Sequence, residues 1–385
     1  HRAPFSGFLA YGDSIMLRYA NLQPGDPTPW ITARTSKNPT FHLNTMAGRY
    51  VVLCFFESAA SEETRRFLAR VHGPDADKFD DDQCAFFGVT VDPEDERQER
   101  VKMQLPGIRY FFDFDQNISR AYGSAAREST PSQKRPYRRL SLILDPRLRV
   151  LQSFEMTDDL DAHARELMTA IAALPRIADE SDSFAPVLVV PRILEPALSK
   201  QVMDYYNAFG GKDAGFMRDI NGKTVEVQDY SHKRRRDQEI EDESLRKECM
   251  YRIHDRLIPQ IKLAFQFQAT RIERYIVACY EAESGGHFRA HRDNTTKGTA
   301  HRRFAVSLNL NTGEYSGGKL RFPEFGRREY EAPAGGAVVF SCSLLHEATP
   351  VTAGRRYAFL PFLYDDAAAQ IRDANRKFVA NAKPQ

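Results

Sequence analysis

Hydrophobic positions along the first half of the chain follow two different periods. Helical spacing of apolar residues predicts helices at 61–73, where Ser61 can cap the N-terminus, and at 158–174. The other apolar residues form short continuous runs, which are typical of buried strands. These runs are YVVLCFF (50–56), CAFFGVTVD (84–92), RRLSLILDP (138–146) and VLQSFEM (150–156). The last two are close enough to form a hairpin. Strands that alternate with helices indicate an α/β layered sheet.

The pattern changes in the second half. A helical stretch, EPALSKQVMDYYNAF (195–209), is followed by a polar, glycine-dotted segment at 210–243. Between 271 and 364 the chain consists of closely spaced strand-like runs separated by Gly, Asn and Pro turns. This spacing is typical of an antiparallel sandwich or jelly roll. A last helical pattern follows at 367–383.

A domain boundary is predicted where the two patterns meet. The stretch PRIADESDSFAP (175–186) is polar, acidic, bounded by prolines and without periodicity. A chain of 385 residues is also long for a single core. We therefore expect a first domain at 1–176, a linker at 177–187, a second domain at 188–366 and a helical tail at 367–385.

Composition and charge narrow the class of protein. With 42% hydrophobic and 28% charged residues, the chain is an ordinary globular protein rather than a disordered one. A formal net charge of +2 gives no reason to expect nucleic acid or an anionic membrane as a partner. No apolar run approaches the roughly 20 residues that span a bilayer, and the first residues lack the pattern of a signal peptide. The five cysteines include no Cys-x-x-Cys pair, so we expect reduced, buried thiols in a cytoplasmic protein.

Candidate chemistry appears in HFRAHRDN, residues 287 to 294. Because alternate residues of an extended strand face the same side, His291 and Asp293 can converge while Arg292 points away. His346, in SCSLLHEATPV, can add a third ligand from a later strand. Two imidazoles and one carboxylate form the facial triad of non-haem Fe(II) oxygenases, which leaves sites for a 2-oxo acid and O₂. Taken singly, the first pair could lie in a surface turn and His346 could be a core histidine.

An arginine ten residues after His346 strengthens the metal interpretation. Arg356, in GRRYAFLPFLY, could hold the distal carboxylate of 2-oxoglutarate in a two-point ion pair, which a neutral side chain cannot do. Arg355 and Arg356 are adjacent on a predicted strand, so only one of them can face a pocket. Together with the glycine turns and the strand order, this arginine favours a metal site over isolated histidines.

These motifs, in this order, resemble a known family. YEAESGGHFRAHRDN, RRFAVSLNLN, YSGGKLRFPEFG, APAGGAVVFSCSLLHEATPV and GRRYAFLPFLY look like consecutive strands of the prolyl-4-hydroxylase-like Fe(II)/2-oxoglutarate dioxygenases, over about 188–366. The resemblance implies a double-stranded β-helix in which the two histidines and the aspartate bind iron. It also implies that Arg356 binds the C5 carboxylate of 2-oxoglutarate, that Tyr280 assists it, and that Asn309 adds a polar contact. Fe(II) would be the metal, 2-oxoglutarate and O₂ the cosubstrates, and ascorbate a candidate accessory reductant.

The first half is similar to another family. GDPTP, GRYVVLCFF and RRLSLILDP occur in the order typical of a peroxiredoxin or related thioredoxin-fold protein, over about 24–174. That family carries a reactive cysteine after its first long strand, at a helix N-terminus. Here the loop reads ESAASEET (57–64) and contains no cysteine, so Arg139, which matches the helper arginine, has no thiol to activate. Cys54 lies inside the strand, where burial makes a thiol inert.

A basic cluster precedes an acidic one in HKRRRDQEIEDE, residues 232 to 243. One interpretation is a solvated loop whose charges partly neutralise each other. The other is a lid over the substrate, because long polar loops that carry glycines often form lids. In a lid, the basic residues could contact an acidic peptide or a substrate carboxylate. They are Lys233, Arg234, Arg235 and Arg236.

The combined interpretation is an α/β thioredoxin-like, peroxiredoxin-type domain followed by a mainly antiparallel double-stranded β-helix, or jelly-roll, domain with flanking helices. The expected activity is 2-oxoglutarate-dependent hydroxylation of a protein or peptide side chain, with release of succinate and CO₂. One alternative is hydroxylation of a free amino acid or another small metabolite. Another is an oxygen, iron or redox sensor that acts through protein contacts. A homodimer stays an open option, since thioredoxin-like domains of this type often pair.

Overall fold

The computed structural model describes residues 19–126, 136–177 and 183–380. The chain forms two compact units, His1–Ile177 and Ala178–Gln385, and each is described by itself. Within the described ranges, no helix is both long enough and apolar enough to cross a membrane.

The N-terminal unit is built on a five-stranded sheet with the strand order β5-β4-β3-β6-β7. The strands are β3 (Tyr50–Glu57), β4 (Cys84–Thr90), β5 (Ile108–Phe112), β6 (Leu140–Leu144) and β7 (Val150–Glu155). The central strand β3 pairs in parallel with β4 and antiparallel with β6, and β6 and β7 form the predicted hairpin. Both faces of β3 are covered, which explains why its sequence is continuously apolar.

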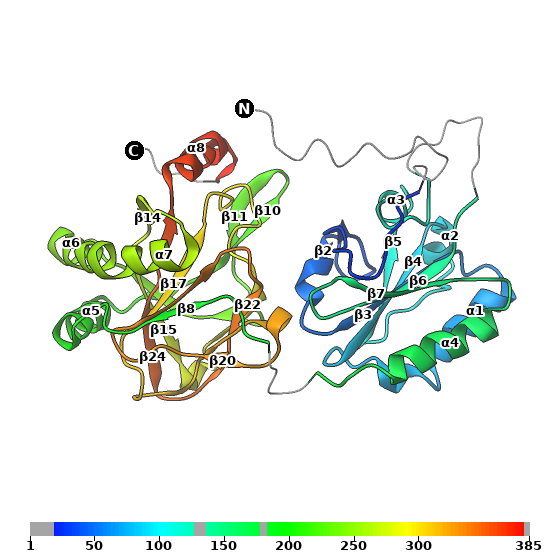
Figure 1. Ribbon diagram of the computed structural model, residues 1–385, viewed down its shortest axis with the longest axis horizontal. Coiled ribbons are helices and arrows are strands. Elements are labelled where there is room, and N and C mark those ends of the chain that lie inside the picture. Colours follow the sequence, from blue (N-terminus) through cyan, green and yellow to red (C-terminus); the bar gives the residue numbers. More distant parts are fainter. Residues whose placement is uncertain (1–18, 127–135, 178–182, 381–385) are drawn as a thin grey trace. The chain divides into compact units, whose positions relative to one another are not determined.

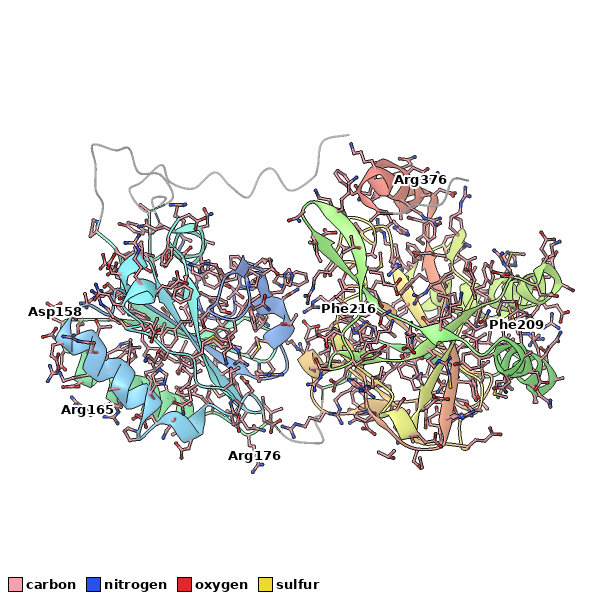
Figure 2. The ribbon with its side chains drawn as sticks, turned by 180° about the vertical axis from the view of Figure 1, so that it is seen from behind. Asp158, Arg165, Arg176, Phe209, Phe216 and Arg376 are labelled. Carbon is pink, nitrogen blue, oxygen red and sulfur yellow. The ribbon has the colours of Figure 1, made fainter. Side chains whose placement is uncertain are left out.

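Helices cover both faces of this sheet (Figure 1). They are α1 (Glu62–His72), α2 (Pro93–Arg97), α3 (Asn117–Tyr122) and α4 (Leu160–Ala172). Apolar residues of α1 and α4 pack together with the Val52, Cys54 and Phe56 side of β3. The outer side of α4 carries polar residues such as Arg165 (Figure 2). Ser61 caps α1 as predicted, because its side chain accepts a hydrogen bond from the backbone of Thr64. The thioredoxin-like layering is confirmed.

The described part of the C-terminal unit contains two large antiparallel sheets and two two-stranded ones, the hairpin described below and the pair of β18 (Ser316–Gly317) with β23 (Val351–Ala353). The larger has the order β14-β25-β17-β24-β15-β13-β9, with β21 added to β17 and β8 to β21. Its strands are β8 (Leu188–Val190), β9 (Lys212–Asp213), β13 (Arg236–Glu239), β14 (Arg271–Glu273), β15 (Ile276–Glu281), β17 (Phe304–Asn309), β21 (Ala337–Ser341), β24 (Arg355–Phe359) and β25 (Phe362–Tyr364).

The smaller sheet has the order β12-β16-β22-β19-β20. Its strands are β12 (Lys233–Arg234), β16 (His287–His291), β22 (His346–Ala348), β19 (Leu320–Arg321) and β20 (Glu329–Tyr330). Side chains of both sheets share one apolar core, in which Phe322 after β19 packs against Phe340 of β21 at a ring distance of 5.0 Å. Two antiparallel sheets around a common core confirm the expected double-stranded β-helix.

Three helices pack on the outer face of the larger sheet (Figure 1). They are α5 (Pro196–Phe209), α6 (Glu243–Arg252) and α7 (Ile258–Phe265). Val277 and Cys279 of β15 belong to this outer core, whereas Ala278 and Tyr280 belong to an inner cluster. Strand alternation therefore decides which residues reach the space between the sheets.

A hairpin and the C-terminal helix complete the unit. The hairpin consists of β10 (Phe216–Ile220) and β11 (Lys223–Val227), and the helix α8 (Asp366–Asn375) is followed by a short turn of 3-10 helix. Backbone N–H of Ala380 donates to the carbonyl of Thr224 over 3.0 Å, so the chain after α8 is attached to the hairpin. Phe216 and Arg376, which mark these two parts, are labelled in Figure 2.

A glycine sets the approach of β16 to β15. A Cβ atom on Gly286 would lie 2.6 Å from the backbone nitrogen of Glu281, and backbone atoms cannot move aside easily. Gly285 has a φ of +67° but open space around it. We predict that Gly286→Ala destabilises the C-terminal unit by about 1–3 kcal/mol through overpacking. Gly285→Asn should cost less, because asparagine tolerates left-handed backbone.

Urea unfolding followed by near-ultraviolet circular dichroism would measure this difference. The single tryptophan, Trp30, lies in the N-terminal unit, so its fluorescence provides an internal control. The Trp30 transition should be unchanged in both variants. Equal midpoints for Gly286→Ala and wild type would contradict the tight approach of the two strands.

Candidate metal centre

The structure brings His291, Asp293 and His346 together. One ligand atom from each lies within 4.8 Å of the others. The Nε2 atom of His291 is 3.6 Å from one Asp293 carboxylate oxygen, and Nε2 of His346 is 3.4 Å from the other. His291 ends β16, His346 begins β22, and the two are direct partners in the antiparallel register. All three side chains are largely buried, with at most 16% exposed.

Backbone carbonyls orient both imidazole rings. Nδ1 of His291 lies 2.8 Å from the carbonyl oxygen of Arg289, and Nδ1 of His346 lies 3.1 Å from that of Leu344. Since a carbonyl oxygen can only accept, each Nδ1 must carry the proton. Each Nε2 is therefore left with a lone pair on the side of Asp293, which is the arrangement that metal-binding histidines adopt.

The protonation states also suit a divalent cation. Burial, with a smaller contribution from His346, lowers the pKa of His291 to about 4. Burial by itself would raise the pKa of Asp293, but the adjacent imidazoles of His346 and His291 hold it well below its usual range. Near neutral pH the site thus has a neutral His291 and an ionised carboxylate. Metal ligands need this combination, because a bound proton would compete with the metal.

Aromatic side chains enclose the two histidines. The ring of Phe288 stacks on His291 with a centroid distance of 3.5 Å, and Phe340 lies 4.5 Å from His346. Two imidazoles and one carboxylate from one side leave the remaining coordination positions for other ligands, as in non-haem Fe(II) oxygenases. The donor set, the tautomers and the apolar surroundings therefore all fit an Fe(II) ion.

Arg356 lies between the sheets as a buried cation without an acidic partner. Its side chain is on β24 beside Tyr280 of β15, and the residue is 2% exposed. Nη2 donates hydrogen bonds to Ser307 Oγ (2.7 Å) and Asn309 Oδ1 (3.1 Å), two residues on the same face of β17. In the part of the chain that the structure describes, Nε of Arg356 has no hydrogen-bond partner and no carboxylate pairs with the guanidinium. A buried unpaired cation is costly, so this pocket suits an anionic ligand.

Strand alternation separates the two adjacent arginines as expected. Arg355 is exposed and pairs with Glu281 over 3.2 Å. The predicted helper Tyr280 is buried with its ring 5.1 Å from the Arg356 guanidinium carbon. Sequence reasoning missed Ser307. Its signal was the position two residues before Asn309, which places both on one side of β17.

The basic segment forms the short strands β12 and β13 rather than a solvated loop, and its four basic side chains do not share one face. Lys233 and Arg235 are 5% and 8% exposed, whereas Arg234 and Arg236 are exposed. The ammonium of Lys233 donates to the carbonyl of Gly215 and lies 4.9 Å from the Phe288 ring centre. Arg235 pairs with Asp237 over 2.6 Å and donates to the Tyr280 hydroxyl over 3.3 Å. Only two of the four residues therefore lie beside the candidate site.

The loop before α1 in the N-terminal unit has no thiol, and carboxylates hold it in place. Ser58 Oγ donates to Asp92 over 2.7 Å, and the backbone N–H of Ala59 donates to Asp95 over 2.9 Å. Asp95 is fully buried. Cys54, on β3, is also fully buried, and burial raises its pKa to about 12. Arg139, the expected helper, pairs with Asp158.

Family comparisons agree with both halves of this description. Residues 275–364 match the model of the 2OG-Fe(II) oxygenase superfamily. Residues 24–153 match the model of the AhpC/TSA family. One stretch of the chain thus matches the AhpC/TSA family and a later stretch matches the 2OG-Fe(II) oxygenase superfamily. The matches confirm the two family resemblances inferred from the sequence motifs, and iron and 2-oxoglutarate follow from the oxygenase family.

Individual relatives cover only part of the chain. A PKHD-type hydroxylase from Synechococcus sp. (strain JA-2-3B'a(2-13)) is 34% identical over 104 residues, which is 25% of this chain and 46% of the relative. A PKHD-type hydroxylase from Thioalkalivibrio sulfidiphilus is 35% identical over 98 residues, which is 23% of this chain and 44% of the relative. The chain thus spans less than half the length of these curated relatives.

Solved structures resemble each half separately. The match to a prolyl-4-hydroxylase from Pseudomonas putida covers 47% of this chain and 92% of the hydroxylase chain, with 19% identity and a TM-score of 0.36. Peroxidoxin BcpB from Mycobacterium tuberculosis covers 40% of this chain and 99% of its own, with 15% identity and a TM-score of 0.34.

The buried thiols lead to a prediction about reactivity. All five cysteines are buried, and burial raises the pKa of each: to about 12 for Cys54, Cys84 and Cys249, to about 11 for Cys279, and well above its usual range for Cys342. Because the thiolate is the reactive form, we expect no fast-reacting thiol in the native protein at pH 8. A chromogenic disulfide reagent should label five thiols only after denaturation. One rapid native thiol, together with peroxide reduction, would contradict the expectation that no cysteine of this chain acts as a peroxidatic thiol.

Proposed function

We propose that this chain is an Fe(II)- and 2-oxoglutarate-dependent dioxygenase that hydroxylates a protein or peptide side chain and releases succinate and CO₂. The observation that carries the proposal is the buried set of His291, Asp293 and His346 in the same β-helix core as the unpaired Arg356. Phe288, which stacks on His291, and Tyr280, which lies beside Arg356, belong to one apolar cluster. This cluster therefore lies between the candidate metal ligands and the arginine. The similarity to PKHD-type hydroxylases supports hydroxylation as the reaction.

Each residue has a defined part in this proposal. His291, Asp293 and His346 would hold the iron, and Arg356 would bind the far carboxylate of 2-oxoglutarate through charge-assisted hydrogen bonds. When bound, the iron and its cosubstrate supply the oxidising power for the reaction. Phe288 and Phe340 would keep water from the site.

The arginine is held for its part by β17. Ser307 and Asn309 accept hydrogen bonds from Nη2 only. They would orient Arg356 while its other donors stay available for the carboxylate. A preorganised donor loses less free energy on binding than one that must first be ordered.

Removal of the carboxylate ligand or of the arginine tests these assignments separately. Asp293→Ala should abolish succinate formation, because the site loses its only anionic ligand. Arg356→Met should raise KM for 2-oxoglutarate about 10- to 100-fold, since a hydrogen bond to a charged group contributes about 1.5–3 kcal/mol. Succinate release, with ascorbate present to keep iron reduced, measures both effects.

The adjacent Arg355→Met provides the matched control, because this exposed side chain faces away from the pocket. It should keep the wild-type KM for 2-oxoglutarate. Succinate formation at the wild-type rate by Asp293→Ala would remove the triad from the mechanism. An unchanged KM in Arg356→Met would remove only the cosubstrate assignment.

We also propose that the buried part of the basic segment faces the substrate. Lys233 lies over Phe288, whose ring stacks on His291, and Arg235 contacts Tyr280. Burial and the neighbouring Arg235 lower the pKa of Lys233, so an anionic group placed there would favour its charged form. This supports an acidic peptide over a neutral metabolite as substrate. The five free cysteines favour a reducing compartment, so we place the reaction in the cytoplasm.

Substitution of Lys233 and of its neighbour Arg234 distinguishes direct substrate binding by Lys233 from a general effect of removing one positive charge. Lys233→Met should raise KM for an acidic peptide substrate about 10-fold or more, because it removes a charged donor beside the site. Arg234→Met should leave KM within about threefold of wild type, since Arg234 is exposed and donates to the carbonyl of Ser284. Steady-state kinetics at saturating 2-oxoglutarate would measure both. Equal KM values in the two variants would exclude Lys233 from substrate binding.

A further inference from the structure

The residue between two of the proposed ligands has a different partner. Arg292 lies between His291 and Asp293, but its side chain is 3% exposed and belongs to a separate ion pair. Its guanidinium makes two parallel contacts with the carboxylate of Glu324: Nη2 donates to Oε1 over 2.8 Å and Nη1 donates to Oε2 over 3.1 Å. Such a two-point pair fixes direction as well as distance.

The same ion pair also holds the chain that leads to the third ligand. Glu324 Oε2 accepts a hydrogen bond from the backbone N–H of Leu345 over 2.9 Å. Nη1 of Arg292 donates to the carbonyl oxygen of Ser343. Leu345 immediately precedes His346, and Ser343 lies three residues before it. Arg292 and Glu324 therefore attach the backbone of the His346 segment to the backbone that carries His291 and Asp293.

This attachment lies where the regular strand pairing ends. β16 stops at His291 and β22 starts at His346, so the ladder between them does not extend to Asp293. Beyond that point the two segments are joined by individual contacts. The backbone N–H of Asp293 donates to the carbonyl of Cys342 over 3.0 Å, and Asn294 Nδ2 donates to Ser343 Oγ over 2.8 Å. The Arg292–Glu324 pair is the charged part of this junction, with side chains that are 3% and 13% exposed.

We propose that Arg292 and Glu324 are positioning residues of the metal centre. The pair sets the separation of His346 from His291 and Asp293 before the metal arrives, so that less ordering is needed on binding. The inference rests on the proposed function, because it concerns the same metal centre. Removal of groups that orient metal ligands typically weakens metal binding about 10- to 100-fold.

Anaerobic titration with Co(II) tests this inference without turnover. Cobalt is a visible probe of an Fe(II) site, because its d–d bands report the number and geometry of the ligands. We expect wild type to bind one Co(II) with distinct bands. Arg292→Met should bind it about 10- to 100-fold more weakly and with altered bands. Arg292→Lys keeps the charge but loses the planar two-point geometry, so it should bind Co(II) with an intermediate Kd.

A control variant separates positioning from general stability. Arg252 pairs with Glu195 over 3.0 Å in the same unit, on helix α6. Arg252→Met should lower the thermal midpoint without changing the Kd or the bands for Co(II). Glu324→Gln preserves side-chain volume and an acceptor for Leu345, so it provides the answer if Arg292→Met does not fold. It should still weaken Co(II) binding.

The outcomes distinguish the two claims. If wild type binds no Co(II) at the triad, the metal centre and the proposed function both fail. If wild type binds Co(II) and both Arg292→Lys and Glu324→Gln show its Kd and bands, the positioning inference is wrong and the proposed function stands. Weaker binding and altered bands in these variants, with unchanged binding in Arg252→Met, supports the inference.

Discussion

The antiparallel register of β16 against β22 is the constraint on which the candidate centre depends. His291 and His346 are direct partners in this register, so both imidazoles reach the same point between the sheets. A slip of one residue would turn one histidine to the opposite face, because side chains alternate along a strand. The register itself is held by apolar contacts on each side, with Phe288 stacked on His291 and Phe340 close to His346.

Strand alternation in the larger sheet places the proposed 2-oxoglutarate-binding residues in the same way. Arg356 and Tyr280 are partners across β24 and β15, and both point inward. Their neighbours Tyr357 and Cys279 point outward and pack beneath the helices. Because the outer core buries Tyr357, strand alternation turns its neighbour Arg356 toward the pocket. Burial of this unpaired cation costs free energy that an anionic ligand would offset.

Short-range patterns predicted much of this arrangement, and long-range pairing accounts for the rest. The alternation in HFRAHRDN was enough to place His291 and Asp293 on one side and Arg292 on the other. Glu324 could not be identified as the partner of Arg292, because 32 residues separate them and their contact depends on the turn after β19. The strand pairing of the basic segment could not be predicted for a similar reason. It forms β12 and β13, whose partners β16 and β15 lie far along the chain.

The central claim is that the triad and Arg356 together form one site for Fe(II) and 2-oxoglutarate. Anaerobic titration of the metal-free protein with both, followed by visible absorption, tests it most directly. The account predicts a charge-transfer band that saturates at one equivalent in wild type and is missing in His346→Ala, which lacks one of the three ligands. The absence of the band in both proteins would contradict the account. The C-terminal unit would then be an oxygenase-like fold without the chemistry, just as the loop at 57–64 lacks the cysteine expected there.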